Sequence, residues 1–275
     1  MNEFSEFFSD EAEEENYFVS MTDMMVGMLF IFVLMLMYYA LQVRIVVDGA
    51  TSTRDTQVRI IQDIVSEVRE GGIEVEEDAE NGIIRLKNNV LFASGDATVS
   101  ERGEAALSLL ASAILTHTRC HTYPVIPPGG VMPNDGTSCE GRRYDIDAIF
   151  IEGHTDTDPI STVRLRDNWD LSTARATNTY RTMVGAEPRL NWLRNAPANI
   201  RRGESVMSVA GYASERPIAP NDTEAQKALN RRIDIRIIMK TPDMSDLPGM
   251  APRPGDARDR GLDMLDEIQT SVPEN

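Results

Sequence analysis

The acidic side chain of Asp23 lies at the start of a long apolar run and could exchange protons. The run, residues 24–43, contains 20 consecutive residues without a charge, and a helix of that length spans about 30 Å, the hydrocarbon thickness of a bilayer. An ionised carboxylate inside a bilayer costs about 2.5–3.5 kcal/mol at the centre. Such a group is kept neutral, paired or hydrated, and it then takes up protons easily. The alternative is that Asp23 is the last polar residue outside the membrane.

The two cysteines of the chain, Cys120 and Cys139, suggest a disulfide. Both lie in residues 116–145, a segment rich in Pro and Gly that we expect to be a loop inserted in a domain. Outside the inner membrane, a bridge would close this loop and stabilise it by about 3 kcal/mol. The alternative is a zinc site completed by His117 and His121. Their spacing matches no common zinc motif, so the sequence favours the disulfide and predicts no metal.

The apolar run predicts one transmembrane helix over residues 17–43. A cleaved secretory signal fits poorly, because such signals begin with a basic region and no Lys or Arg precedes Arg44. A buried helix of a soluble protein is rarely apolar on all sides for so long.

Residues 44–72 are polar and predict a helical linker. Four apolar residues recur in it at spacings of 3, 4 and 3, which places them on one helix face: Val58, Ile61, Val65 and Val68. Two alternatives remain open. The helix could pack on its own domain, or two copies could pair in parallel as an extension of two membrane helices.

Residues 73–240 predict one compact α/β domain, an α+β sandwich with helices packed on a sheet. Helix and strand patterns alternate along it. The expected helices cover 101–116, with Ser100 as N-cap, and 169–183; the expected strands cover 83–86, 90–92, 146–152, 205–209 and 233–239.

Composition narrows the function. The 275 residues carry a net charge of −17, which argues against a nucleic-acid binder, and their 41% hydrophobic content is enough for a core. We expect two acidic tails at the ends. One is cytoplasmic, residues 1–16, and the other is disordered, residues 241–275.

The string FVSMTDMMVGMLFIFVLMLMYYAL, residues 18–41, resembles the membrane helix of MotB-type stator subunits. In that family an Asp at this place is the proton acceptor of a channel formed with a multi-helix A subunit. The resemblance implies that Asp23 accepts the proton and that Ser20 and Thr22 support it by hydrogen bonding.

Four further strings closely resemble the OmpA-like peptidoglycan-binding domain of MotB, OmpA and Pal proteins. They are FASGDA (92–97), IEGHTD (151–156), NWDLSTARA (168–176) and GYASERPIAPNDTEAQKALNRRIDI (211–235). Any one of them is weakly specific, but all four occur in the family's order over about 145 residues. In that family the ligand is the diaminopimelate part of the cell-wall stem peptide.

The resemblance assigns the ligand-binding residues. Asp156 pairs with the ligand's ammonium, and Arg175 holds its carboxylate through a bidentate fork. Asn168 matches a hydrogen-bonding Asn of the family. Arg231 and Arg232 match its paired arginines; one of them could reach the ligand, and a salt bridge that holds the last strand is the equal alternative.

Two features of this region test the resemblance. The connection from Asp156 to Asn168 is longer than the family's usual one and could cover or obstruct the pocket. His154 invites a catalytic interpretation, but no nucleophile, base and orienting group occur together, so we expect a structural histidine and no enzymatic activity.

The implied protein is a single-pass inner-membrane B subunit of a proton-driven stator, with H⁺ as the translocated ion and no cofactor. Its partners would be a multi-span MotA-like or ZorA-like A subunit, a second copy of itself and peptidoglycan. Arg44, Arg54 and Arg59 follow the helix, which by charge alone places the domain in the cytoplasm. We weigh the domain's identity above this pattern and expect a cytoplasmic N-terminus and a periplasmic domain.

The sequence also predicts which cellular system this subunit belongs to. The acidic stretch 11–15, the cysteine-bearing insertion and the acidic tail make the chain most similar to the ZorB subunits of Zorya anti-phage defence systems. The alternatives are a flagellar MotB-type subunit and a passive peptidoglycan tether.

Overall fold

The computed structural model describes residues 3–93, 95–132, 139, 145–162, 165–197 and 203–241, without the side chains of residues up to 20 and of 45, 46, 48 and 50. Most of the predicted C-terminal tail, the side chains of the acidic N-terminal segment and the middle of the predicted insertion lie outside this part of the chain. The described chain forms two compact units, Met1–Ala50 and Thr51–Asn275.

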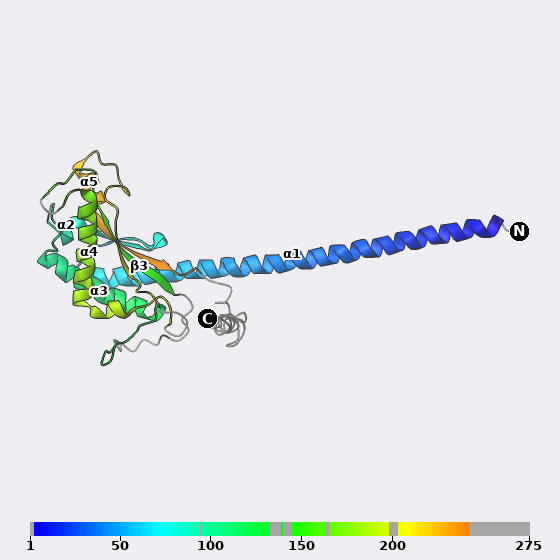
Figure 1. Cartoon of the computed structure of the whole chain (residues 1–275), viewed down its shortest axis with the longest axis horizontal. Helices are drawn as coiled ribbons and strands as arrows, with labels where there is room; N and C mark the ends of the chain where they lie inside the picture. The colour runs from blue at the N-terminus through cyan, green and yellow to red at the C-terminus, as the bar shows by residue number, and fades with distance from the viewer. Residues whose placement is uncertain are drawn as a thin grey trace, which may run out of the picture. The chain divides into compact units, whose positions relative to one another are not determined.

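The first unit is helical and apolar. Helix α1, Glu3–Glu70 (Figure 1), begins in this unit. By length and composition its window Met21–Arg44 can cross a membrane, with a mean hydropathy of 2.3 and none of the window buried. It is the one such helix among the described residues.

The C-terminal part of α1 belongs to the second unit and is amphipathic. Its core-facing side chains have at most 4% of their surface exposed: Ile60, Ile61, Ile64, Val65 and Val68. Gln57 Nε2 also donates to the Ile237 carbonyl of the last strand at 2.7 Å. Of the two alternatives for residues 44–72, the structure shows packing on the chain's own domain, so the second half of the predicted linker is part of the core.

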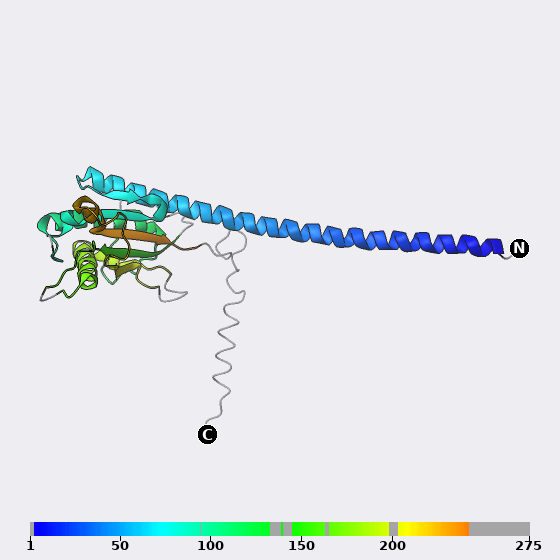
Figure 2. The same ribbon diagram turned by 90° about the horizontal axis from the view of Figure 1, so that it is seen from above.

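A mixed sheet in the order β1-β2-β5-β3-β4 forms the centre of the second unit (Figure 2). Its strands are β1 (Glu76–Asp78), β2 (Ile83–Lys87), β3 (Ile146–His154), β4 (Met207–Gly211) and β5 (Arg232–Met239). The pairs are antiparallel except β3 and β4, which are parallel. The predicted arrangement, an N-terminal apolar helix followed by a mixed α/β domain, is confirmed.

Helices α3 (Glu101–Thr118) and α4 (Asn168–Ala186) pack on each other, and α4 contacts β3 and β4. Ser100 caps α3 by accepting from the Gly103 amide. At Gly153 of β3, an added Cβ would lie 2.1 Å from the Ser172 carbonyl oxygen. Only glycine therefore allows α4 to come so close to the strand whose end carries Asp156.

The predicted strand 90–92 is wrong. Asn88–Leu91 form a short helix, α2, and Phe92 makes only an isolated bridge with Val99. Three apolar residues in a row fit one helical turn as well as a short strand. Strand β1 and helix α5 (Glu224–Asn230) were not expected, since both are polar and short.

Candidate ligand-binding site

A pocket of about 700 Å³ lies where three segments of the second unit meet. The segments are α2 with the loop after it, the connection from β3 to α4 together with the N-terminal half of α4, and α5 with the residue that follows it. All four side chains that the family resemblance assigns to ligand binding line this pocket: Asp156, Asn168, Arg175 and Arg231. Residues separated by up to 75 positions in the sequence are thus brought to one cavity.

The Asp156 carboxylate is almost buried and already has a cationic partner. It follows the end of β3, and 6% of the residue is exposed. Its Oδ2 lies 2.6 Å from Nη1 of Arg231, and its Oδ1 accepts from the Asp158 amide at 3.1 Å. A ligand ammonium that binds Asp156 therefore meets a carboxylate that is fixed in place and shared with Arg231.

Arg175 on α4 is a buried cation held by backbone groups. Only 2% of the residue is exposed. Its Nε donates to the Asp96 carbonyl at 2.8 Å, and its guanidinium lies 5.4 Å from the centre of the Phe92 ring. Burial lowers the pKa of Arg175 to about 10, while the nearby charge of Asp156 opposes this shift. The side chain stays charged at neutral pH.

No carboxylate of the described residues forms an ion pair with Arg175. A buried charge without a direct ion pair is expensive, because the interior solvates it poorly, and the nearby charge of Asp156 compensates only in part. Arg175 lines the pocket, so an anionic group that enters the pocket can supply the missing partner. A carboxylate fits the planar fork of a guanidinium.

The connection from Asp156 to Asn168 forms part of the pocket wall. Nδ2 of Asn168 donates to the carbonyls of Asp156 at 3.2 Å and Asp158 at 2.9 Å, which holds the first turn of the connection. Asp158 Oδ1 in turn lies 2.5 Å from Lys227 Nζ on α5. In its described part the connection contributes Asp158, Pro159 and Ile160 to the lining.

The paired arginines separate into two roles. Arg231 lies in the pocket, where its Nη2 also contacts Oε1 of Glu224 at 2.5 Å. Arg232 is 5% exposed and binds Asp234 of the same strand at 3.0 Å and the Arg216 carbonyl at 3.2 Å. The salt-bridge alternative thus describes Arg232, and contact of Arg231 with a ligand stays a prediction.

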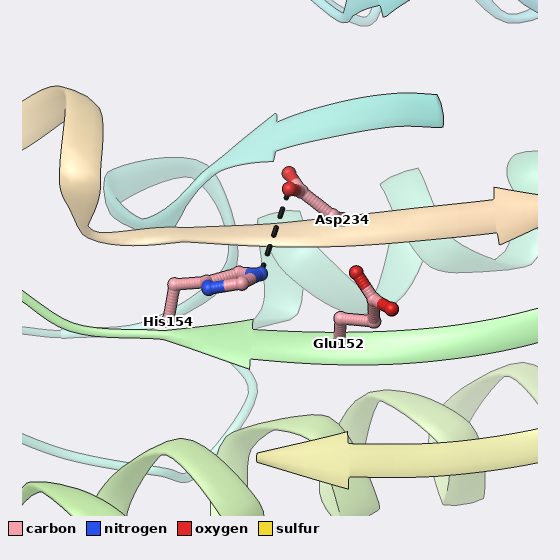
Figure 3. Close-up of side chains that lie close together, drawn as sticks. All are labelled: Glu152, His154 and Asp234. Atoms are coloured by element: carbon pink, nitrogen blue, oxygen red, sulfur yellow. Dashed lines mark ion pairs between the residues drawn. The ribbon is translucent and has the colours of Figure 1, made fainter. Parts of the chain in front are cut away.

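A second polar cluster lies within the sheet and contains His154 (Figure 3). Glu152, His154 and Asp234 are at most 2% exposed, and their potential ligand atoms lie within 4.8 Å of one another. Nε2 of His154 is 3.5 Å from Asp234 Oδ2, too far for a good hydrogen bond.

Guanidinium groups already balance the two carboxylates of this cluster. Arg236 holds Glu152 through two hydrogen bonds of 3.0 and 2.9 Å, and Arg232 holds Asp234. Burial, followed by the charges of four arginines, lowers the pKa of His154 to about 3, so the ring is neutral. A metal ion would have to compete with these arginines, and we assign the cluster to the core.

Cys120 and Cys139 are joined by a disulfide in the structure. Both thiols are therefore used, and the alternative zinc site is not formed. His117, one of its proposed ligands, instead contacts Glu67 of α1, with Nε2 2.9 Å from the carboxylate oxygen. This contact ties α3 to the part of α1 that packs in the second unit.

The predicted proton acceptor lies in the first unit. Asp23 and Thr22 are exposed near the start of the apolar window, and the side chain of Ser20 lies outside the described part of the chain. Their roles stay predictions.

Several pocket residues were not found from the sequence. Lys87, Phe92 and Glu224 line the cavity, and Lys227 holds its wall. Glu224, Lys227 and Arg231 follow at spacings of 3 and 4, the repeat of one helix face. That spacing of charges was a usable signal, although it occurs in a polar segment where no amphipathic pattern marks a helix.

The chain is similar to two curated proteins of Bacillus subtilis (strain 168), and no family model matches it. It is 26% identical over 187 residues to the uncharacterized protein YtxE, covering 66% of this chain and 60% of that protein. It is 24% identical over 166 residues to Motility protein B, covering 60% and 48%. The chain thus aligns with less than two thirds of either relative's length. These matches support the MotB-like resemblance.

Among solved structures, a MotB-like protein from Desulfovibrio vulgaris is similar at 22% identity. The TM-score is 0.46, and the match covers 71% of this chain and 99% of that one.

Proposed function

We propose that this chain is the cell-wall-anchored B subunit of a proton-driven stator complex in the bacterial inner membrane. One observation carries the anchoring role. The buried guanidinium of Arg175 has no carboxylate partner among the described residues, and it lines a pocket together with the Asp156 carboxylate. This pair of opposite charges suits an amino acid with a free ammonium and a free carboxylate, such as the diaminopimelate of a peptidoglycan stem peptide.

The membrane role rests on Asp23 in the apolar window Met21–Arg44. Two copies of this chain would lie within a ring of multi-span A subunits, and Asp23 would take up and release H⁺. Each proton that crosses 100 mV supplies about 2.3 kcal/mol, enough to bias a packed interface between two states. The wall-bound domains would hold the B subunits still while the ring moves.

The disulfide supports a periplasmic domain and a cytoplasmic N-terminus. Disulfides persist in the periplasm and are rare in the cytosol, so the Cys120–Cys139 bridge opposes the orientation that the basic residues after the helix suggest.

Within this function, we propose Zorya-type anti-phage defence as the system. The acidic stretch 11–15, the disulfide-bearing insertion and the acidic tail favour it over flagellar motility.

Sedimentation of the full-length protein with purified sacculi tests the anchor. We expect the wild type to sediment with sacculi and Asp156→Asn and Arg175→Lys to lose most of this binding. The first change removes the carboxylate charge, and the second replaces the planar fork of the guanidinium with a point charge. Arg166→Gln is the matched control, since Arg166 is exposed and binds Asp170 outside the pocket. Equal sedimentation of all four proteins would show that this pocket does not bind the wall.

Asp23→Asn tests the ion-driven role, measured as protection from phage in cells that also carry the A subunit. We expect Asp23→Asn to abolish protection and leave sacculus binding unchanged, and Asp23→Glu to retain part of the activity. If Asp23→Asn protects as well as the wild type, the chain is a passive tether.

A further inference from the structure

The guanidinium of Arg231 bridges two carboxylates at the pocket. Its Nη1 lies 2.6 Å from Asp156 Oδ2, and its Nη2 lies 2.5 Å from Glu224 Oε1. The Asp156 side chain is 8% exposed, whereas that of Glu224 is 75% exposed. The inner contact of Arg231 is therefore with the same carboxylate that a ligand ammonium needs.

A ligand that carries only an ammonium would leave the pocket with unbalanced charge. An ammonium that binds Asp156 at Oδ2 takes the place of Nη1 of Arg231, and the pocket would then hold the ammonium, Arg231 and Arg175 around one buried carboxylate. Glu224 can keep its contact with Arg231, but it is exposed and compensates weakly. Arg175 would still have no anionic partner.

A ligand that carries a carboxylate beside its ammonium avoids this imbalance. Its ammonium replaces Arg231 at Asp156, while its carboxylate pairs with Arg175 and accepts the freed Nη1 of Arg231. Each charge in the pocket then has an opposite charge, and the buried guanidinium gains a partner.

We propose that Arg231 is a specificity-determining residue, which competes with the ligand's ammonium for Asp156 and so admits only amino-acid ends with a free carboxylate. Amines and ends whose carboxylate is amidated are rejected. This inference rests on the proposed binding of a stem-peptide amino acid, and it adds a selection for the unamidated form of that ligand.

Calorimetry on the full-length protein in detergent, with three small probes, tests the inference. The probes are meso-diaminopimelate, its diamide, and 1,5-diaminopentane, which keeps both ammonium groups and lacks both carboxylates. A hydrogen bond to a charged group corresponds to a difference of about tenfold or more in affinity. We therefore expect the wild type to bind diaminopimelate at least about tenfold more tightly than either other probe.

Arg231→Gln should lower this preference, while the part that Arg175 contributes should remain. Without the competing guanidinium, an ammonium of the diamine binds the Asp156 carboxylate more easily. The ammonium of diaminopimelate gains the same advantage, but its carboxylate loses the contact with Arg231. The ratio of the two affinities should fall by about tenfold. Arg231→Lys keeps the charge and should keep most of the ratio. Lys227→Gln, which breaks only the neighbouring pair with Asp158, should leave it unchanged.

The outcomes separate this inference from the proposed function. If the wild type binds diaminopimelate and Arg231→Gln weakens all three probes by the same factor, Arg231 is an ordinary binding residue and the selection is wrong. If the wild type binds the diamine as tightly as diaminopimelate, the selection is also wrong. If the wild type binds none of the probes, both the inference and the proposed ligand are wrong.

Discussion

Two stretches of helix α1 show how differently the same kind of side chain is used in this chain. In the window Met21–Arg44 every turn is apolar, and Ile31 has 68% of its surface exposed. Between residues 53 and 70 apolar side chains occupy one face only, and Ile64 is fully buried in the core of the second unit. The hydrophobic effect drives both, but the first stretch needs lipid or other chains to cover it.

This difference extends to the charged residues of the two units. Asp23 is exposed in an apolar window, so any group that pairs with its carboxylate comes from outside the described chain. In the pocket, by contrast, the chain's own backbone and side chains position Arg175 and Asp156. The proposed wall binding should therefore survive changes in the first unit, whereas the proposed ion coupling would require an assembly.

The largest expected effect contrasts Ile64→Ala with Ile31→Ala. Removing the buried side chain of Ile64 leaves a cavity, and we expect the free energy of unfolding of the domain to fall by about 2–5 kcal/mol. Ile31→Ala creates no cavity within the chain and should leave domain unfolding unchanged. Denaturant unfolding of both full-length variants in detergent, followed by near-UV circular dichroism, measures this. Equal destabilisation would show that the two stretches are not independent.

Cys120→Ser should lower the free energy of unfolding of the domain by about 3 kcal/mol, because the bridge restricts the unfolded chain. The bridge closes a loop with a sequence separation of 19. Reduction of the wild type should produce the same loss, and the helicity of the first unit should not change. A wild type that is equally stable with and without reductant would contradict this expectation.

The family's motifs named four of the residues that line the pocket but not how those residues pair. Asp156, Asn168, Arg175 and Arg231 were named because their motifs resemble those of the family, and all four line one cavity. Alternation predicted β3, and helical periodicity predicted α4. The predicted fold class followed from the same patterns.

The pairing could not be predicted because it depends on contacts between distant segments. Arg175 is held by the carbonyl of Asp96, 79 positions away, and backbone carbonyls leave no mark on residue type. Asp156 pairs with Arg231 instead of Arg175, a choice that the geometry of α5 decides. The two alternatives for residues 44–72 also shared one apolar pattern, and only the packed structure shows that the second half of this segment lies in the core of the domain.

A smaller effect should follow from the pH dependence of the buried cluster. The pKa of His154 is lowered from 6.5 to about 3 by burial and the neighbouring arginines. Between pH 6.5 and 5 the unfolded chain therefore binds a proton at this ring and the folded protein does not. The free energy of unfolding should decrease by up to about 1.4 kcal/mol per pH unit as the pH is lowered.

His154→Gln should flatten this slope, because the amide does not titrate. Burial raises the pKa of Asp234, whose carboxylate lies 3.5 Å from the ring, and this gives a slope of the opposite sign, so the contribution of His154 is the difference between the slopes of the two proteins. Unfolding midpoints measured at pH 6.5 and 5 for both proteins provide the comparison. The same slope in both would mean that His154 is protonated in the folded state.

The smallest expected effect compares two helix caps, at Thr223 and Ser100. Thr223 accepts from the Gln226 amide in a capping box at the start of α5, and Ser100 accepts from the Gly103 amide at the start of α3. Each change to Ala should lower stability by about 1 kcal/mol. Of these two helices, α5 carries pocket residues and α3 does not, since Glu224 lies within α5 and Arg231 directly follows it.

Thr223→Ala should therefore weaken the binding of diaminopimelate several-fold, whereas Ser100→Ala should not change it. The reason is that a frayed α5 lets Glu224 release Arg231, and the pocket must then order these side chains when the ligand binds. Equal binding by both variants would show that α5 is held in place by contacts other than its cap, with the hydrogen bonds of Asn230 to the Ile218 amide and the Ala219 carbonyl as the next candidates.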